Sequence, residues 1–209
     1  MAISYRFSRA EAAETAAEIA ALGRRAVAVE CDVRSEPSVR SAVAAILAEF
    51  GHLDLVVNNA AVFASGALES LTLEQWDAAF ETNARGPFLV AREALPHLRS
   101  ARGRIINIGS LGGFHPWPGH AHYCASKAAL HMLSETMAKA WAPEVSVNCV
   151  VPGRIVQGEI DEAYARFAAK TPMQRNGTAE DVAAAVLFFA TGPHFITGQL
   201  LAVDGGLGL

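Results

Sequence analysis

The chain has 209 residues, of which 52% are hydrophobic and 18% are charged. This length fits one domain, and the apolar content is enough for a large buried core, which excludes global disorder. A formal net charge of −4 argues against nucleic-acid binding, because proteins of that class usually carry a basic stripe.

Short apolar strands alternate with helices along the whole chain. The first half predicts a strand at 2–7, a helix at 8–23, a strand at 26–30, a helix at 35–50, a strand at 53–57 and a long helix at 72–98. The second half predicts a strand at 104–108, a helix at 121–141, a strand at 145–151, a helix at 178–189 and a strand at 199–203. Strands without in–out alternation are covered on both faces, which indicates a parallel α/β sheet. We therefore predict a doubly wound, Rossmann-like sheet in a single domain over residues 1–209.

Polar residues mark the beginnings of three of these helices. The pairs are Ser8 with Glu11 and Thr72 with Gln75, which form capping boxes, and Thr178 with Asp181.

The three cysteines, Cys31, Cys124 and Cys149, include no Cys-x-x-Cys pair, so reduced thiols are expected. The seven histidines form no His-Glu-x-x-His pattern, and we predict no metal site. The N-terminus lacks the pattern of a secretory signal, and the longest apolar stretch is too short to cross a bilayer. These features predict a cytoplasmic protein without a membrane partner.

Small or polar residues follow four of the predicted strands. They are Cys31-Asp32-Val33, Asn58-Asn59-Ala60-Ala61, Gly109-Ser110 and Pro152-Gly153. One such cluster is most often an ordinary strand-to-helix turn. Four at the carboxyl ends of parallel strands indicate a ligand site, because open α/β sheets bind ligands at that edge.

The sharpest signal is the run Tyr123-Cys124-Ala125-Ser126-Lys127. Four residues separate Tyr123 from Lys127, so on a helix they share one face. A Tyr-x-x-x-Lys pair arises easily by chance. However, Ser110 follows an apolar strand, and Asn83 lies in Glu-Thr-Asn-Ala-Arg-Gly-Pro-Phe. With these residues the chain resembles the short-chain dehydrogenase/reductase family over nearly its whole length.

The resemblance implies a nicotinamide-dependent oxidoreductase that acts on a small carbonyl or alcohol substrate. The implied catalytic residues are Asn83, Ser110, Tyr123 and Lys127. The implied cofactor-binding residues are Arg6, Ser8, Arg9, Asp32, Val33, Asn59, Ala60, Ala61, Tyr123, Lys127, Pro152, Gly153 and Ile155. Among them Asp32 and Val33 are expected to contact the adenine, and Pro152-Gly153 to approach the nicotinamide amide. The family's closing motif matches Thr197-Gly198 and Asp204-Gly205-Gly206.

The chemistry of carbonyl reduction suits these residue types. Tyr123 would donate the proton, or accept it in the oxidation direction, and a lysine ammonium about 4 Å away could lower its pKa by roughly three units. Ser110 would donate a hydrogen bond to the substrate oxygen. The resemblance further implies that Lys127 holds the nicotinamide ribose and that Asn83 positions a water between Lys127 and solvent.

The choice of cofactor depends on the residues after the first predicted strand. An acid there favours NAD, whereas arginines favour the 2′-phosphate of NADP. Arg6, Ser8 and Arg9 therefore favour NADP, and NAD is the alternative. Without a function in cofactor binding, the two arginines would simply be solvated charges near the start of a helix. The substrate stays open between those of 3-oxoacyl-carrier-protein reductases and of pteridine-reductase-like enzymes. His115, Trp117, His120 and His122 are expected at the pocket mouth, and residues 157–177 are expected to cover the substrate.

Relatives in this family begin with a strand, a glycine-rich phosphate loop and a helix, whereas Met1 falls almost at the family's second strand. Either the start was assigned too late or the chain is truncated. Three hypotheses remain: an active reductase, a non-catalytic oligomerisation module with impaired cofactor binding, and an unstable fragment. Self-association as a homotetramer or homodimer is expected. It rests on the two long helices and on their apolar residues Leu130, Met132, Leu133 and Met137.

Overall fold

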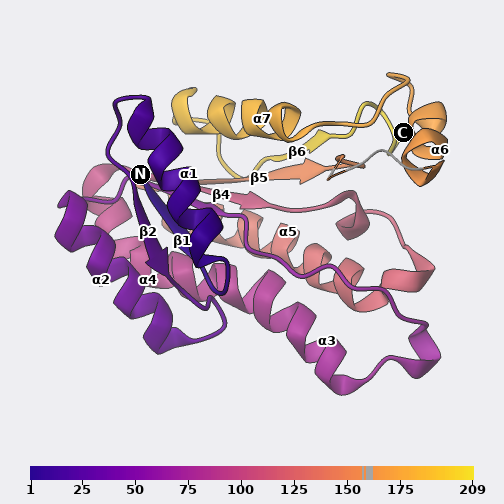
Figure 1. Ribbon diagram of the computed structural model, residues 1–209, viewed down its shortest axis with the longest axis horizontal. Helices are drawn as coiled ribbons and strands as arrows, with labels where there is room; N and C mark the ends of the chain where they lie inside the picture. Colours follow the sequence, from indigo (N-terminus) through magenta and orange to yellow (C-terminus); the bar gives the residue numbers. More distant parts are fainter. Residues whose placement is uncertain (157, 159–161) are drawn as a thin grey trace.

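The structure is a computed structural model that describes residues 1–156, 158 and 162–209. All of its paired strands run parallel. They form two sheets (Figure 1). One sheet pairs β1 (Ala2–Tyr5) with β2 (Val27–Glu30). The other contains, in spatial order, β3 (Leu55–Asn58), β4 (Arg104–Ile108), β5 (Ser146–Pro152) and β6 (Leu200–Val203). The predicted α/β fold with parallel strands is confirmed.

Helices cover both faces of the larger sheet (Figure 1). Apart from short turns, the helices of the described residues are α1 (Arg9–Ala21), α2 (Glu36–Phe50), α3 (Leu73–Phe80), α4 (Gly86–Ala101), α5 (Ala121–Trp141), α6 (Glu162–Lys170) and α7 (Ala179–Thr191). Helices α4 and α5 pack on one face, where Ile105 and Val147 are fully buried. Helix α7 packs on the other face, where Phe189 meets Ile106 and Val150. These two cores hold the ends of β4 and β5 in place.

A smaller core joins the two sheets. Val39 and Val43 of α2 pack against Leu89 of α4, together with Cys31 at the end of β2. Helix α2 therefore connects the β1–β2 sheet to α4, the helix that packs on the larger sheet. Strand β1 has β2 as its only neighbour, and β3 has β4 as its only neighbour, among the strands of the described residues. The other edges of β1 and β3 therefore have no strand partner in that part of the chain, and Val57 on β3 is 41% exposed.

Two of the three predicted helix starts have the expected side-chain caps. Thr72 and Thr178 each accept a hydrogen bond from the third residue of the helix, and each capping box is complete. The prediction for Ser8 is wrong, because its side chain makes no capping hydrogen bond and its backbone is not extended. Extended backbone at the cap position is what normally directs such a side chain back to the helix amides.

The long helix predicted at 72–98 is three consecutive segments. α3 and α4 are separated by a π-helical turn at Glu81–Arg85, and Pro87 lies in the first turn of α4. The apolar pattern continues across this turn, so periodicity alone predicts one helix. None of the helices of the described residues is both long and apolar enough to cross a membrane.

The segment expected to cover the substrate contains a helix that the sequence did not predict. This helix is α6, and Tyr164 within it is buried. After α6 an isolated parallel bridge pairs Gly177 with Ile155, which follows the end of β5. Gln157 and residues 159–161 of the predicted cover lie outside the described residues.

Candidate active site

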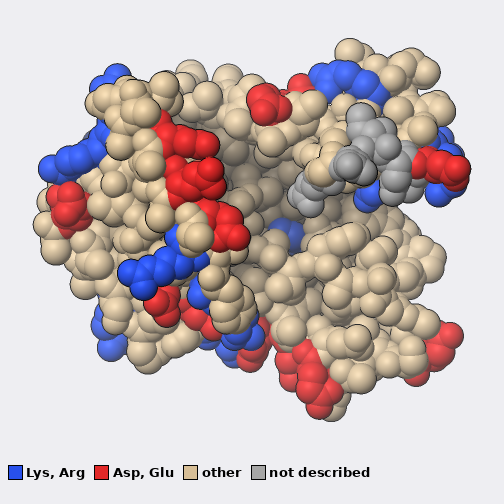
Figure 2. Space-filling model, in the orientation of Figure 1, with Lys and Arg blue, Asp and Glu red and all other residues tan. Residues whose placement is uncertain are grey.

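The predicted strand-end segments meet along one edge of the fold. Parallel strands end on the same side, so Arg6 after β1 and Asp32 after β2 flank each other, and Ser110 after β4 lies next to the end of β5. We call this edge the carboxyl rim. Figure 2 shows the face of the molecule hollowed through its middle, between the part that carries α3 and the part that carries α6.

Ser110 lies in a tight turn directly after the sheet. The amide of Gly109 still donates to Val150 O of β5 at 2.7 Å, and Ser110 is the next residue along the chain. Its backbone is extended, and its Oγ accepts the amide N–H of Gly112 at 3.1 Å. Only 5% of Ser110 is exposed, so this hydroxyl sits in a fixed position at the rim.

Tyr123 approaches Ser110 from the first turn of α5. Burial raises the pKa of Tyr123 above its usual value, and a side-chain hydrogen bond with Ser110 acts in the opposite direction. Two aromatic rings lie beside it, Phe63 edge-on at 4.8 Å and Trp117 stacked at 6.1 Å between ring centroids. The sequence predicted Trp117 near this site but not Phe63, which lies in an irregular segment with no motif of its own.

Lys127 is buried one turn further along α5. Its Nζ donates to Ile108 O at 2.8 Å, and only 3% of the residue is exposed. Burial lowers the pKa of Lys127 to about 8, because the ammonium group loses hydration. Nζ lies 5.8 Å from the centroid of the Tyr123 ring. The expected lowering of the tyrosine pKa by this ammonium is not found in the structure; burial dominates, and Ser110 opposes it.

Asn83 fixes the chain that follows β3. It lies in the π-helical turn and is fully buried. Its Oδ1 accepts the Val62 amide at 2.8 Å, and its Nδ2 donates to Val62 O and to Ser126 Oγ, both at 3.0 Å. The side chain thus uses all of its donors and one acceptor on the protein. The role of Asn83 in holding a water, expected from the resemblance, stays a prediction.

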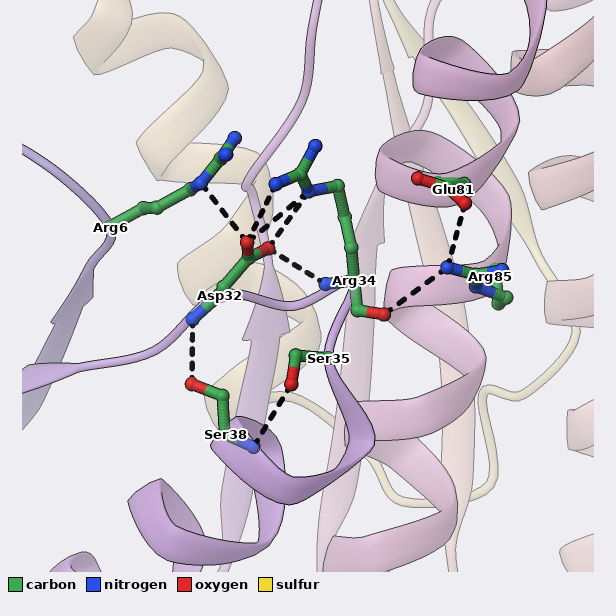
Figure 3. Close-up of polar contacts among 7 residues, drawn as sticks. All are labelled: Arg6, Asp32, Arg34, Ser35, Ser38, Glu81 and Arg85. Atoms are coloured by element: carbon green, nitrogen blue, oxygen red, sulfur yellow. Dashed lines mark hydrogen bonds and ion pairs between the residues drawn. The ribbon is translucent and has the colours of Figure 1, made fainter. Parts of the chain in front are cut away.

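At the other end of the rim two arginines share one carboxylate (Figure 3). Arg34 donates to Asp32 through Nε and Nη2, the latter at 2.8 Å, and Arg6 Nε lies 3.1 Å from the same carboxylate. The hydrogen bond from Arg34 is the main cause that lowers the pKa of Asp32 to about 2. Arg85, paired with Glu81, donates to the Arg34 carbonyl. Arg34 was not predicted from the sequence, where its only signal is its place next to Asp32-Val33.

This cluster shows what Asp32 contacts within the chain. Its carboxylate faces two guanidinium groups, and its backbone amide donates to Ser38 Oγ at 3.0 Å. The expected contact of Asp32 with an adenine ring stays a prediction. An ionised carboxylate accepts such charge-assisted hydrogen bonds readily, and they are stronger than neutral ones. Asp32 therefore holds Arg6 and Arg34 together.

The other predicted cofactor-binding residues lie along the rim or beside it. Ser8 and Arg9 are exposed at the start of α1, and Asn59, Ala60 and Ala61 form an exposed stretch after β3. Val33 packs so closely on Gly86 that a Cβ there would lie 2.8 Å from its Cγ2. Pro152 ends β5, Gly153 packs tightly against Asp204, and Ile155 pairs with Gly177.

The four residues expected at the pocket mouth separate into two groups. His115 is exposed, while Trp117 and His120 are partly exposed near Tyr123, with His120 stacked on Phe63 at 4.5 Å. His122 was placed wrongly, because only 2% of it is exposed. It falls on the inward face of α5, one turn before Ser126. Within the described residues, no cluster of three or more His, Cys, Asp or Glu side chains could hold a metal ion.

Comparisons with known proteins identify relatives of this chain. The family model described as Enoyl-(Acyl carrier protein) reductase matches residues 1–208. The chain is 33% identical to the 3-oxoacyl-acyl-carrier-protein reductase FabG of Staphylococcus aureus strain Mu50, covering 99% of this chain and 87% of the relative. It is 36% identical to the 3-oxoacyl-acyl-carrier-protein reductase of Synechocystis, covering 98% of this chain and 85% of the relative.

Solved structures at about the same sequence identity superpose on this chain over nearly its whole length. A gluconate 5-dehydrogenase from Burkholderia cenocepacia in complex with NADP and tartrate superposes with a TM-score of 0.91 at 30% identity, over 99% of this chain and 84% of that chain. A blue fluorescent protein from a metagenomic library in complex with NADPH superposes with a TM-score of 0.93 at 31% identity, over 100% of this chain and 87% of that chain.

Proposed function

Because this chain belongs to the short-chain dehydrogenase/reductase family, we propose that it transfers a hydride between NADP(H) and a small carbonyl or alcohol substrate. The observation that carries this proposal is the meeting of Ser110, Tyr123 and Lys127 at the carboxyl rim, from two elements that are fixed by the core. The names of the relatives give different substrates, so the proposal names only the reacting group of the substrate, a carbonyl or an alcohol.

The hydroxyl groups of Tyr123 and Ser110 have different roles at the substrate oxygen. Tyr123 gives its proton to the oxygen during reduction and takes it back during oxidation. Ser110, which acts to lower the pKa of Tyr123, donates to the same oxygen and stabilises its developing charge. The nicotinamide supplies the hydride when it is bound.

Lys127 supplies positive charge beneath this pair. Its ammonium is buried and anchored on Ile108 O, so it stays in place when a substrate arrives. In the chain alone burial dominates the pKa of Tyr123. We expect the ammonium to favour the phenolate once substrate and cofactor exclude water from the site, because a cation acts more strongly at low dielectric. Asn83 acts through the backbone of Val62 and through Ser126, and so fixes the segment after β3 against α5.

The rim residues fit a phosphate-bearing nicotinamide cofactor. Arg6 and Arg34, held by Asp32, place two cations against one anion at the β1–β2 end. Proton-transfer groups lie at the β4–β5 end. The residues proposed to hold the cofactor are those of the rim: Arg6, Ser8, Arg9, Asp32, Val33, Asn59, Ala60, Ala61, Tyr123, Lys127, Pro152, Gly153 and Ile155.

The direct test is titration of the chain with NADPH by calorimetry, followed by NADPH consumption with a panel of ketones and aldehydes. Saturable binding with turnover supports a reductase. A second candidate function, a non-catalytic module, is favoured by the edges of β1 and β3 that have no strand partner among the described residues. Absence of NADPH binding by a chain that unfolds cooperatively in urea would favour this second candidate.

Arg6 and Arg9 are predicted to select NADP over NAD. Charge-assisted contacts to a phosphate contribute about 1.5–3 kcal/mol each. Replacing both arginines by alanine should therefore raise the Kd for NADPH by at least tenfold and leave the Kd for NADH nearly unchanged. Calorimetric titration with both cofactors measures the difference.

Arg40→Ala is the matched control, since Arg40 is an exposed arginine of α2 that pairs with Glu36 away from Asp32. It should alter neither Kd. Equal losses of NADPH and NADH affinity in the double variant would show that the two arginines do not read the 2′-phosphate.

We also propose that the chain assembles as a homotetramer or homodimer through the outer faces of α4 and α5. The structure corrects part of the basis for this proposal, because Leu130 and Met137 are buried within the chain itself. Met132 is 62% exposed and Phe88 37% exposed, so these two helices still present apolar surface. Light scattering should give a dimer or tetramer, and Met132→Glu should shift it towards monomer. A monomeric wild-type chain at micromolar concentration would contradict the proposal.

A further inference from the structure

The amide of Ser110 has a side chain, not a strand, as its hydrogen-bond partner. The β4–β5 ladder ends with the bond from Gly109 to Val150 O, so Ser110 is the first residue that the sheet does not hold. Its N–H instead points to His131 Nε2 at 3.4 Å. His131 lies on α5, one turn beyond Lys127, and is 5% exposed.

The imidazole of His131 also fills the space beneath the turn that carries Ser110. A Cβ added to Gly109 would lie 2.4 Å from its Nε2, and one added to Gly113 would lie 2.4 Å from its Cε1. The ring of Phe114 packs on it with centroids 4.6 Å apart. Two glycines are thus needed in this turn because the imidazole occupies the place of their side chains.

We propose that His131 is a positioning residue that sets the place of Ser110, by accepting the Ser110 amide on Nε2 and by seating Gly109 and Gly113. This inference rests on the proposed function, because Ser110 matters through its hydroxyl. No motif indicated it, since the contact depends on how the turn at 109–113 folds back over α5.

The chemistry of the ring is consistent with an acceptor at Nε2. Burial, and then the charge of Lys127, lower the pKa of His131 to about 4, so the ring is neutral at pH 7. A neutral imidazole has one donor and one acceptor. Because an amide is always a donor, Nε2 is the acceptor and the proton resides on Nδ1, which has no hydrogen-bond partner in the described part of the chain.

Two substitutions separate the hydrogen bond from the volume of the ring. His131→Leu keeps an apolar side chain of similar size but has no acceptor, whereas His131→Gln can place an amide oxygen near the position of Nε2. We expect kcat to fall about tenfold in the leucine variant, with KM changed less than twofold, because one hydrogen bond of this kind contributes up to that factor. The glutamine variant should keep kcat within about threefold of the wild type.

A double-mutant comparison tests whether the effect passes through Ser110. On a Ser110→Ala background, His131→Leu should cause no further loss of kcat, because the hydroxyl that it positions is gone. A tenfold loss that persists on that background would overturn the proposal, and so would equal kcat values in the leucine and glutamine variants. A Ser110→Ala variant with full activity would instead contradict the proposed function.

Hydrogen exchange at the Ser110 amide gives a readout that needs no turnover. In native-state exchange followed by NMR, this amide should exchange about tenfold faster in the leucine variant than in the wild type, and the glutamine variant should restore most of the protection. Unchanged protection in the leucine variant would overturn the proposal even if the chain proves inactive. Urea unfolding of each variant identifies any general loss of stability.

Discussion

Replacing Tyr123 by phenylalanine is expected to lower kcat by about 10²–10⁴-fold, the usual contribution of a positioned proton donor. The change removes only the hydroxyl and keeps the ring that packs against Phe63 and Trp117. The fold should therefore stay intact. Steady-state rates of NADPH consumption with the best ketone of the panel measure the effect, and circular dichroism and urea unfolding check the fold.

Tyr5→Phe is the matched control for the loss of a phenol hydroxyl. Tyr5 ends β1, on the smaller sheet, and lies outside the Ser110 turn. Its variant should keep the wild-type rate. A Tyr123→Phe variant with more than about a tenth of the wild-type rate would remove Tyr123 from the proposed mechanism. Loss of a positioned proton donor lowers the rate by at least about a hundredfold.

Lys127→Met is expected to abolish turnover and at the same time stabilise the fold. The ammonium is almost fully buried, and the drop of its pKa from 10.5 to about 8 corresponds to about 3 kcal/mol of free energy lost to folding at neutral pH. Methionine has a similar shape without the charge, but it leaves Ile108 O without a hydrogen bond from Nζ, at a cost of about 1–3 kcal/mol. The net gain should be about 1 kcal/mol in urea unfolding at pH 7.

The pH dependence of unfolding gives a second test of the stability gained in Lys127→Met. Because the pKa of Lys127 is lowered in the folded state, the unfolded chain binds more protons between about pH 8 and 10.5. The free energy of unfolding of the wild type should therefore rise with pH from 8, and its deficit relative to the methionine variant should shrink. The pKa of Cys149 is raised from 9.0 to about 11, mainly by burial, which acts in the opposite direction above pH 9. Unfolding is best compared between pH 8 and 9.

Lys139→Met serves as the control, because Lys139 is an exposed lysine in the last turn of the same helix. It should change neither stability nor rate by a measurable amount. A Lys127→Met variant that is less stable than the wild type throughout this pH range would show that the bond to Ile108 O outweighs the cost of burying the charge. Turnover above a tenth of the wild-type rate would remove Lys127 from the mechanism.

Elements with both a clear pattern and a clear boundary could be predicted from the sequence. Helix α5 has the predicted bounds, Ala121–Trp141, and β4 has the predicted bounds, Arg104–Ile108. Thr178 begins α7 as expected. In each case the local sequence signals and the burial pattern favour the same secondary structure, so tertiary packing does not change it. The same regularity placed Tyr123 and Lys127 on one face of a helix and Ser110 at the end of a strand.

The features that could not be predicted depend on the path of the backbone in three dimensions, either within a turn or between distant segments. The π-helical turn at Glu81–Arg85 keeps the apolar pattern of a continuous helix, and its one local signal is Gly86-Pro87 directly after it. Arg34 could not be assigned to Asp32 without the path of the chain after β2. His131 reads as an ordinary helix residue until the turn that carries Ser110 is placed against it.

The division of the strands into two sheets has a thermodynamic consequence for anything that binds along the rim. The cationic end of the rim belongs to the β1–β2 sheet and the proton-transfer end to the β3–β6 sheet, and the α2–α4 contact joins them. A ligand that touches both ends also acts as a tie between the sheets. Its affinity and the preference of the sheets for one relative placement are linked, so each strengthens the other by the same amount. Substitutions in the core between α2 and α4, such as at Val39 or Leu89, would then weaken binding from a distance, without a contact to the ligand.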